Sequence, residues 1–238
     1  MCRGKAVCEI LGTDTTKWSN KCPLPLPDFF ETALENFSDA VASLVEGNLE
    51  ESLGYLERCN SDLVGHFFIE HGQQSAYFRV TNRKEIDAAN LLAKAANKTP
   101  RLIPRVENEV FVRDSYHCRY CEIRIVAKDV FSEFSRIVGT ERFSVKREND
   151  KRNGLTLGLR GVADHVEPYA SGGETAIDNL VTSCYSCNFG KAGYTLEQLR
   201  IEDPRLRPPI VDSWRGLTEH LPALRSIKSV KTANEPND

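Results

Sequence analysis

The sequence has no long hydrophobic run and no strong net charge. No segment of its 238 residues approaches the roughly 20 consecutive apolar residues of a membrane-spanning helix, which excludes a membrane protein built from such helices. The first ten residues carry charges where a secretory signal peptide has its apolar centre, so we expect a cytoplasmic protein. With 40% hydrophobic and 27% charged residues, the chain is globular, and its length predicts one large domain or two modest ones.

The net charge of −3 conceals a segregation of charge along the chain. Residues 1–100 contain 10 basic and 14 acidic side chains, whereas residues 101–160 contain 13 basic and 9 acidic ones. The first range is therefore net −4 and the second net +4. An excess of this size fits a local phosphate-binding face, and it also fits an ordinary solvated surface.

The first 100 residues are interpreted as a helical domain without a chemical motif. Apolar residues recur at helical spacing over 28–46, where Asp28 is the expected N-cap and Gly47 the expected end. Asn48 is the expected cap of a second helix that ends near Leu56. Within this range, further helices are expected over 62–71 and 83–97. Beyond it, helices are expected over 104–113, 129–138, 188–200 and 217–224.

The rest of the chain combines strands with helices, so the predicted fold class is α+β. Alternating side chains predict strands over 123–126 and 161–166. The stretch 141–160 is rich in Lys, Arg, Asn and Gly and is interpreted as a basic hairpin. Several prolines near the end predict an irregular tail. The expected divisions are a helical domain over 1–100, a second domain over 101–203 and a tail over 204–238.

Two Cys-x-x-Cys pairs, Cys118 with Cys121 and Cys184 with Cys187, are the strongest motif. In a reducing compartment this spacing is typical of metal thiolates, not of disulfides. Four thiolates form a closed tetrahedral site, so the pairs predict a structural zinc ion. Two unrelated thiol pairs, or one redox pair, would be the alternative.

The other four cysteines lack this spacing. A second zinc site formed by them is one reading, and buried or otherwise ordinary free thiols are the simpler one. We assign no role to Cys2, Cys8, Cys22 and Cys59.

An acid and an imidazole lie between the two cysteine pairs, at Asp164 and His165, and Asn188 follows the second pair. Hydrolysis of a phosphodiester needs a base for water and a cation that neutralises the developing charge on the phosphate. An imidazole with a few oxygen ligands supplies both, in the sparse manner of magnesium sites. Because neighbouring strand residues point to opposite faces, we expect the strand to twist or bulge at this pair.

In their order along the chain, these residues resemble the HNH nucleases of the ββα-metal fold, in the zinc-containing form related to McrA-like endonucleases. The resemblance covers roughly residues 110–195. It implies a helical domain followed by a ββα-metal nuclease module that a four-cysteine zinc site holds together. The matching motifs are Arg113-Asp114, Cys118 to Cys121, Asp164 to Pro168, Gly172-Gly173, Asn179 to Val181, and Cys184 to Lys191.

The resemblance also implies roles for individual residues. His165 would be the general base, while Asp164 and Asn188 would bind a catalytic Mg²⁺ or Mn²⁺ ion. Asn179 would brace the loop and orient His165, and Lys191 would contact a phosphate. The implied reaction is in-line attack of water on DNA, which leaves a 5′-phosphate and a 3′-hydroxyl.

The chain departs from the family pattern in two places. Asn188 occupies the position of the final His in the name HNH. Many active members of the family also carry Asn at this position. The 42 residues between Cys121 and Asp164 exceed the usual connection. They include a basic insert over about 128–160, whose basic stretch we expect to contact the DNA backbone.

The expected partner is DNA, with a homodimer or a partner protein such as an ATPase contacting the N-terminal helices. Restriction or anti-phage defence is the pathway that the resemblance suggests. One alternative is a non-catalytic zinc-containing module that binds nucleic acid. Another is a zinc nucleobase deaminase, because His165-Val166-Glu167 and the second cysteine pair mimic its signature, although Ser183 and Gly172-Gly173 depart from it.

Overall fold

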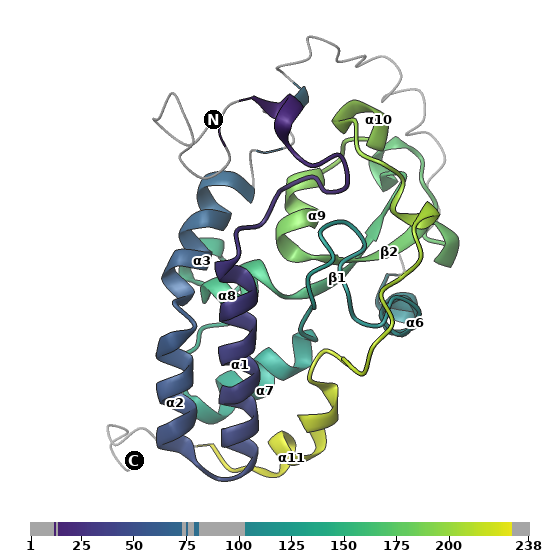
Figure 1. Ribbon diagram of the computed structural model, residues 1–238. Coiled ribbons are helices and arrows are strands. Elements are labelled where there is room, and N and C mark those ends of the chain that lie inside the picture. The colour runs from purple at the N-terminus through teal and green to yellow at the C-terminus, as the bar shows by residue number, and fades with distance from the viewer. Residues whose placement is uncertain (1–11, 13, 73–74, 76–78, 81–102, 230–238) are drawn as a thin grey trace.

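Figure 1 shows the computed structural model of the chain, in which helices surround one small sheet. The predicted helix over 83–97 lies outside the described residues, as do Cys2 and Cys8. The mixed fold class and the helical N-terminal part are both confirmed. The structure describes residues 12, 14–72, 75, 79–80 and 103–229.

The N-terminal part is helical, as the apolar periodicity predicts. Helices α1 (Phe29–Val45) and α2 (Leu49–Arg58) run side by side (Figure 1). They are followed by α3 (Ser61–Phe67), which continues into a π-helical turn over Phe68–Gly72. Helix α1 buries one stripe of apolar side chains and leaves most of its polar residues at the surface, which explains its spacing pattern.

The end of α1 is built as expected, but its beginning is not. Gly47 has a φ of 88°, and its N–H and that of Asn48 donate to the carbonyls of Leu44 and Ser43, which satisfies the last turn. Asp28 and Asn48 make no side-chain capping hydrogen bond. Both residues occupy the expected N-cap positions and both helices begin where expected, but the side-chain hydrogen bonds of a cap are absent.

The second half carries the sheet and the remaining helices. Helices α6, α7 and α11 confirm the predictions over 104–113, 129–138 and 217–224, with a 3-10 turn over Thr218–His220 preceding α11. The elements are α6 (Ile103–Arg113), α7 (Lys128–Val138), α8 (Gly154–Gly158), β1 (Gly161–His165), β2 (Leu180–Cys184), α9 (Tyr185–Lys191), α10 (Leu196–Leu199) and α11 (Leu221–Ser226).

Strands β1 and β2 form an antiparallel pair, and α9 follows β2 directly. The register runs without a bulge from Gly161 opposite Cys184 to His165 opposite Leu180. Helix α9 lies beside both strands (Figure 1). The sequence predicts β1 correctly, whereas the predicted helix over 188–200 begins earlier, at Tyr185, and is split into α9 and α10.

The expected strand over 123–126 is wrong. In this segment Arg124 forms a single bridge with His117, and Val126 forms one with Arg160. Consecutive backbone N–H groups donate to different segments, that of Ile125 to Tyr116 and that of Val126 to Leu159. Because no single neighbour accepts the whole segment, no ladder forms.

The expected basic hairpin over 141–160 is also wrong. The stretch contains a 3-10 turn over Asn149–Lys151 and the short helix α8, which Asn153 caps through its side chain. Leu155 and Leu157 are both buried, as in a packed helix and unlike two residues that flank a solvated position. Helix α8 packs closely on α3, where a Cβ on Gly154 would lie 1.8 Å from the Ser61 carbonyl oxygen.

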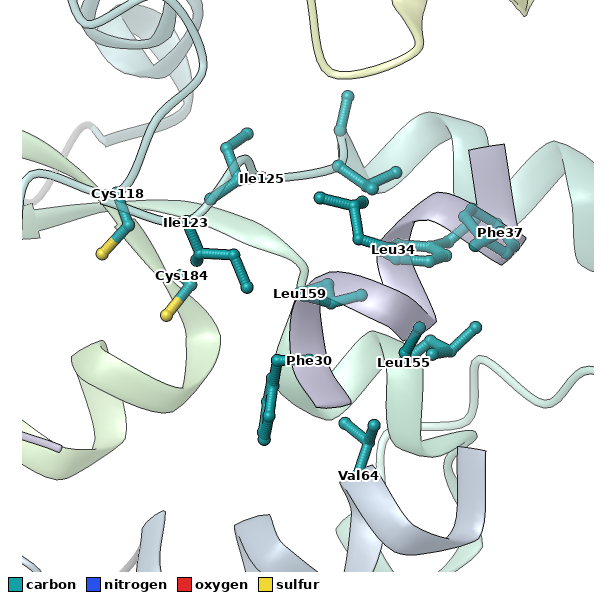
Figure 2. Packing of buried hydrophobic residues seen from close by; sticks show 14 of the residues in the cluster. Phe30, Leu34, Phe37, Val64, Cys118, Ile123, Ile125, Leu155, Leu159 and Cys184 are labelled. Carbon is teal, nitrogen blue, oxygen red and sulfur yellow. The ribbon is translucent and has the colours of Figure 1, made fainter. Parts of the chain in front are cut away.

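One hydrophobic cluster extends from the N-terminal helices into the second half of the chain. The Phe37 ring of α1 lies 5.0 Å from that of Phe131 and 5.1 Å from that of Phe134, both on α7. Figure 2 shows Cys118 and Cys184 at one edge of this cluster, with their sulfur atoms pointing to the same side. Within the described residues, no helix has both the length and the apolar character needed to cross a bilayer.

Candidate functional site

The four paired cysteines converge on one point. The Sγ atoms of Cys118, Cys121, Cys184 and Cys187 all lie within 4.8 Å of one another, and those of Cys121 and Cys184 are 3.7 Å apart. Four sulfur atoms at roughly 2.3 Å from one tetrahedral zinc ion would be about 3.8 Å apart. The cluster therefore has the donor set and the dimensions of a metal site, as the spacing predicts.

Backbone hydrogen bonds shape the first cysteine turn and tie it to β2. The Cys118 N–H donates to the Ile123 carbonyl over 2.8 Å, and the Glu122 N–H donates to the Cys118 carbonyl over 2.8 Å. The Arg119 N–H donates to the Thr182 carbonyl of β2 over 2.7 Å. The turn is thus fixed to the sheet also through Arg119, which is not one of the four cysteines.

The second turn uses a cysteine as a helix cap. The Sγ atom of Cys184 accepts a hydrogen bond from the Cys187 N–H over 3.3 Å at the beginning of α9. This sulfur replaces the oxygen that usually caps a helix. The helix therefore begins at Tyr185, earlier than a search for oxygen caps would place it.

The thiols of the cluster influence one another strongly. Burial raises the pKa values of Cys121, Cys184 and Cys187, and it would raise that of Cys118 as well. Hydrogen bonds from the other three thiols instead lower the pKa of Cys118 well below its usual value. A cation bound among the four sulfur atoms would stabilise their thiolate forms in this buried place.

The remaining described cysteines do not join the cluster. Cys22 and Cys59 are buried free thiols, and burial raises the pKa of each to about 12. Among the described residues, the group of Cys118, Cys121, Cys184 and Cys187 is the one set of three or more His, Cys, Asp or Glu side chains that could hold a metal. His165 is not part of that group, so the geometry gives no support to the deaminase alternative.

A separate pocket of about 380 Å³ opens between the end of β1 and α9. Four of the residues expected at the hydrolytic site line it, namely Asp164, His165, Asn188 and Lys191. Tyr169 and Phe189 form part of its wall. Asp164 and His165 both reach the pocket although the strand ladder is regular, so the bulge considered from the sequence is absent from β1.

Asp164 is buried and held by two groups. Its Oδ2 accepts a hydrogen bond from the Tyr120 hydroxyl over 2.7 Å and lies 3.3 Å from the Lys191 ammonium. Burial raises the pKa of the carboxyl, whereas Lys191 and Tyr120 oppose that shift by stabilising the anion. Both contacts involve Oδ2.

Lys191 is fully buried, which the sequence did not reveal. Its ammonium group donates to the His165 carbonyl over 2.7 Å while it pairs with Asp164. The side chain therefore bridges the two residues at the end of β1. Its expected role as a phosphate contact stays a prediction, and any phosphate would meet an ammonium that is already paired.

His165 is 4% exposed and contacts the loop between the strands. Its Nε2 lies 2.9 Å from the Thr175 hydroxyl oxygen, and its ring centroid is 5.8 Å from that of Tyr169. These contacts set the orientation of the imidazole at the pocket.

Asn179 connects the two ends of that loop. Its side-chain oxygen accepts from the Glu167 N–H over 2.9 Å, and its amide nitrogen donates to the carbonyls of Glu167 and Glu174 over 3.1 and 2.9 Å. Glu174 precedes Thr175, the hydroxyl partner of His165. Asn179 thus ties the loop together from a position outside the residues that line the pocket, and its expected role in orienting His165 stays a prediction.

Gly173 leaves no room for a side chain within this loop. A Cβ there would lie 1.9 Å from the Glu167 carbonyl oxygen and 2.9 Å from Asn179 Nδ2. The glycine therefore permits the close crossing of the loop on which the Asn179 contacts depend.

Asn188 lines the pocket from α9 and is half-buried. Within the described parts of the chain, no group forms a hydrogen bond with its side-chain amide. An amide oxygen in this state is a suitable neutral ligand for a hard cation.

Tyr120 and Thr175 are the site residues that sequence reasoning missed. Tyr120 lies inside the first cysteine turn, and no spacing rule states what a residue at that position contacts. Thr175 follows Glu174 in a loop whose path only the tertiary structure defines. The aromatic character of Tyr120 between two expected zinc ligands was the one available signal.

Arg113 and Asp114, also part of the sequence resemblance, support the sheet. Asp114 Oδ2 accepts from the Thr182 N–H over 2.7 Å, and Arg113 Nη2 donates to the Leu180 carbonyl over 2.7 Å. The two side chains also pair with each other over 2.9 Å. They connect α6 to β2 and take no part in the pocket.

The basic stretch reaches the helix that carries Asn188. Arg152 and Arg160 lie over the Tyr185 ring of α9, with guanidinium carbons 5.6 and 5.4 Å from its centroid. Lys146, Arg147 and Lys151 are exposed nearby in the sequence.

Two strands followed by a helix form a ββα arrangement, and a carboxylate, an imidazole and an amide from it line one pocket. Residues 160–192 match the family model of the HNH endonucleases, and this range contains β1, β2 and α9. The second half of the chain therefore carries an HNH endonuclease segment, with the four-cysteine cluster beside it. No curated protein and no solved structure matches the chain.

Proposed function

We propose that the chain is a divalent-metal-dependent HNH endonuclease that hydrolyses phosphodiester bonds in DNA. The observation that supports this most strongly is that Asp164, His165 and Asn188 line one pocket within the segment that matches the family. The three residues come from a strand end and a helix, which are rigid elements suited to hold reacting groups.

The residues of the pocket fit a hard divalent ion such as Mg²⁺ or Mn²⁺. Asp164 offers an anionic oxygen, Oδ1, since both of its contacts fall on Oδ2. Asn188 offers a neutral amide oxygen. Two protein oxygens suit an ion that keeps several water ligands and also binds a phosphate. When bound, such an ion supplies positive charge that stabilises the phosphate in the transition state.

The imidazole of His165 is the group that we propose as general base. In the proposed reaction, one ring nitrogen takes a proton from the attacking water, and the water oxygen forms a bond to phosphorus on the side opposite the 3′-oxygen. The bond between phosphorus and the 3′-oxygen breaks, and the released 3′-oxygen takes a proton from solvent water. The products carry a 5′-phosphate and a 3′-hydroxyl. Thr175 orients the ring, and Asn179 holds the loop that carries Thr175.

The four cysteines are proposed to bind a structural zinc ion. Four thiolates leave no open position for substrate, so this ion would stabilise the fold and take no part in hydrolysis. The proposed contacts with the DNA backbone are Lys146, Arg147 and Lys151, which are exposed in the basic stretch.

A role in restriction or anti-phage defence, and a homodimer or partner protein such as an ATPase at the N-terminal helices, complete the proposal. These finer statements are supported by the family resemblance alone.

Plasmid cleavage tests the proposed activity. Purified wild-type protein should nick or cut plasmid DNA with Mg²⁺ or Mn²⁺, and should do neither with EDTA. His165→Ala should reduce the rate at least about 100-fold while the protein stays folded, because a positioned base contributes roughly 10²–10⁴-fold. His66→Ala is the matched control, since His66 is exposed on α3, and it should cut like wild type.

The non-catalytic alternative makes a different prediction for the same assay. A zinc-containing binding module would bind DNA with an affinity that falls steeply with salt. The His165→Ala variant would bind DNA equally well, and neither protein would cut it. Cleavage by His165→Ala at the wild-type rate would show that the assignment of the base is wrong.

A further inference from the structure

Tyr120 connects the cysteine cluster directly to the pocket. It lies between Arg119 and Cys121 in the first turn and is fully buried, and its hydroxyl donates to Asp164 Oδ2 over 2.7 Å. This hydrogen bond joins a side chain of the first cysteine turn to the carboxylate that we propose as a metal ligand.

The contact is selective for one carboxylate oxygen. Tyr120 and Lys191 both approach Oδ2, from the cysteine turn and from α9 respectively. A carboxylate held through one oxygen by two donors cannot rotate freely. Its other oxygen, Oδ1, is then presented in a fixed direction.

The position of the Tyr120 hydroxyl depends on the cysteine turn. Cys118 and Cys121 flank the residue pair that contains Tyr120, and the Arg119 N–H donates to the Thr182 carbonyl over 2.7 Å. A movement of either cysteine would therefore displace the hydroxyl from Asp164.

We infer that Tyr120 is a positioning residue that aligns Asp164 for the catalytic divalent ion and thereby couples the structural metal cluster to the hydrolytic site. This inference rests on the proposed function, because it takes Asp164 as a ligand of that ion. It gives the first cysteine turn a role beyond stabilising the fold. Groups that orient a metal ligand commonly change metal affinity about 10- to 100-fold when they are removed.

Tyr120→Phe isolates the hydroxyl, because the ring that fills the core is kept. Tyr116→Phe is the matched control. Tyr116 is also buried, at 5% exposure, and its hydroxyl donates to Asn108 Oδ1 over 3.2 Å, away from the pocket. Both variants lose one hydrogen bond of a buried tyrosine, and only the first loses a contact with Asp164.

The test measures Mn²⁺ binding to the zinc-loaded, full-length protein from the decrease of the free Mn²⁺ signal in electron paramagnetic resonance. Zinc content and thermal unfolding are measured on the same samples. Tyr120→Phe should keep its zinc and bind Mn²⁺ about 10- to 100-fold more weakly than wild type. Tyr116→Phe should bind Mn²⁺ like wild type. In an Asp164→Asn background, Tyr120→Phe should have no further effect, because the hydroxyl acts through that carboxylate.

Other outcomes separate the two proposals. Wild-type Mn²⁺ affinity in zinc-loaded Tyr120→Phe would overturn the inference and leave the proposed function intact. Loss of zinc from Tyr120→Phe, with zinc retained by Tyr116→Phe, would also overturn it, since the hydroxyl would then support the cysteine turn and not the carboxylate. A wild-type protein that binds Mn²⁺ but never cuts DNA would instead defeat the proposed function.

Discussion

Asp164 and Lys191 illustrate how single residues build this site. Both are buried, and each charge is accepted because the other lies 3.3 Å away. Removing one partner from such a pair leaves an uncompensated buried charge, which is usually strongly destabilising. Lys191 is thus expected to keep Asp164 in the anionic form that a divalent ion needs, in addition to any role with phosphate.

At the same scale, Cys184 has two functions in the structure. It belongs to the four-sulfur group, and its Sγ caps α9. Cys184→Ser should lower the zinc content from about one ion per chain to near zero and lower the unfolding temperature, because metal binding and folding are coupled in such sites. Elemental analysis by mass spectrometry and calorimetry measure the two effects.

Cys59→Ser is the control for this variant. Cys59 is buried at the end of α2, and it lies outside the four-sulfur group. The Cys59→Ser variant should be somewhat less stable than wild type but should keep its zinc. Wild-type zinc content and unfolding temperature in Cys184→Ser would contradict the structural-zinc assignment.

Among the elements, the loop between β1 and β2 is the one on which the orientation of His165 depends. Gly173→Ala should displace the loop, since its Cβ would lie 1.9 Å from the Glu167 carbonyl oxygen. Forcing extra volume into such a place typically costs about 1–3 kcal/mol of unfolding free energy. We expect a loss of that size in urea unfolding, together with a slower cleavage rate.

Gly193→Ala provides the comparison, because a Cβ at Gly193 would meet no atom within 4 Å. That variant should unfold much like wild type, and only its stability is compared, because Gly193 lines the pocket. Equal stability of the two variants would show that the loop does not cross as closely as the structure indicates.

The elements also show what a sequence reveals. Helices α1 and α7 were predictable because each buries one stripe of apolar side chains at helical spacing. The segment 123–126 has the alternation of a strand, but its N–H groups donate to separate partners. Alternation reports which side chains are buried, and it does not report whether a continuous neighbour is present.

The residues that line the pocket and form the cysteine cluster were predictable only in part. The cysteine spacing and the Asp164, His165 and Asn188 set carry local chemistry that a sequence displays. The burial of Lys191 and its contact with Asp164 depend on how α9 lies beside β1. The Tyr120 contact spans 44 positions, so only the folded chain reveals it.

In the whole molecule, the helical N-terminal part and the HNH segment share one hydrophobic cluster. Phe37 of α1 packs against aromatic rings of α7, and α3 packs on α8 (Figure 1). The division into domains at residues 100 and 203 stays a prediction. The shared cluster implies that a disturbance of the N-terminal helices would reach α8, which packs on α9, the helix that carries Asn188.

We propose that the whole molecule binds two metal ions with different tasks. One would lie among four sulfur atoms, and the other among Asp164, Asn188 and solvent. These two places are chemically distinct, since soft thiolates favour zinc whereas carboxylate and amide oxygens favour Mg²⁺ or Mn²⁺.

Anomalous X-ray diffraction from crystals grown with Mn²⁺ tests this claim most directly. Data collected at the zinc and manganese absorption edges should give a zinc peak at the centre of Cys118, Cys121, Cys184 and Cys187. A separate manganese peak should lie roughly 2.0–2.3 Å from oxygen atoms of Asp164 and Asn188. A pocket without a manganese peak, with Mn²⁺ bound elsewhere or not at all, would contradict the account.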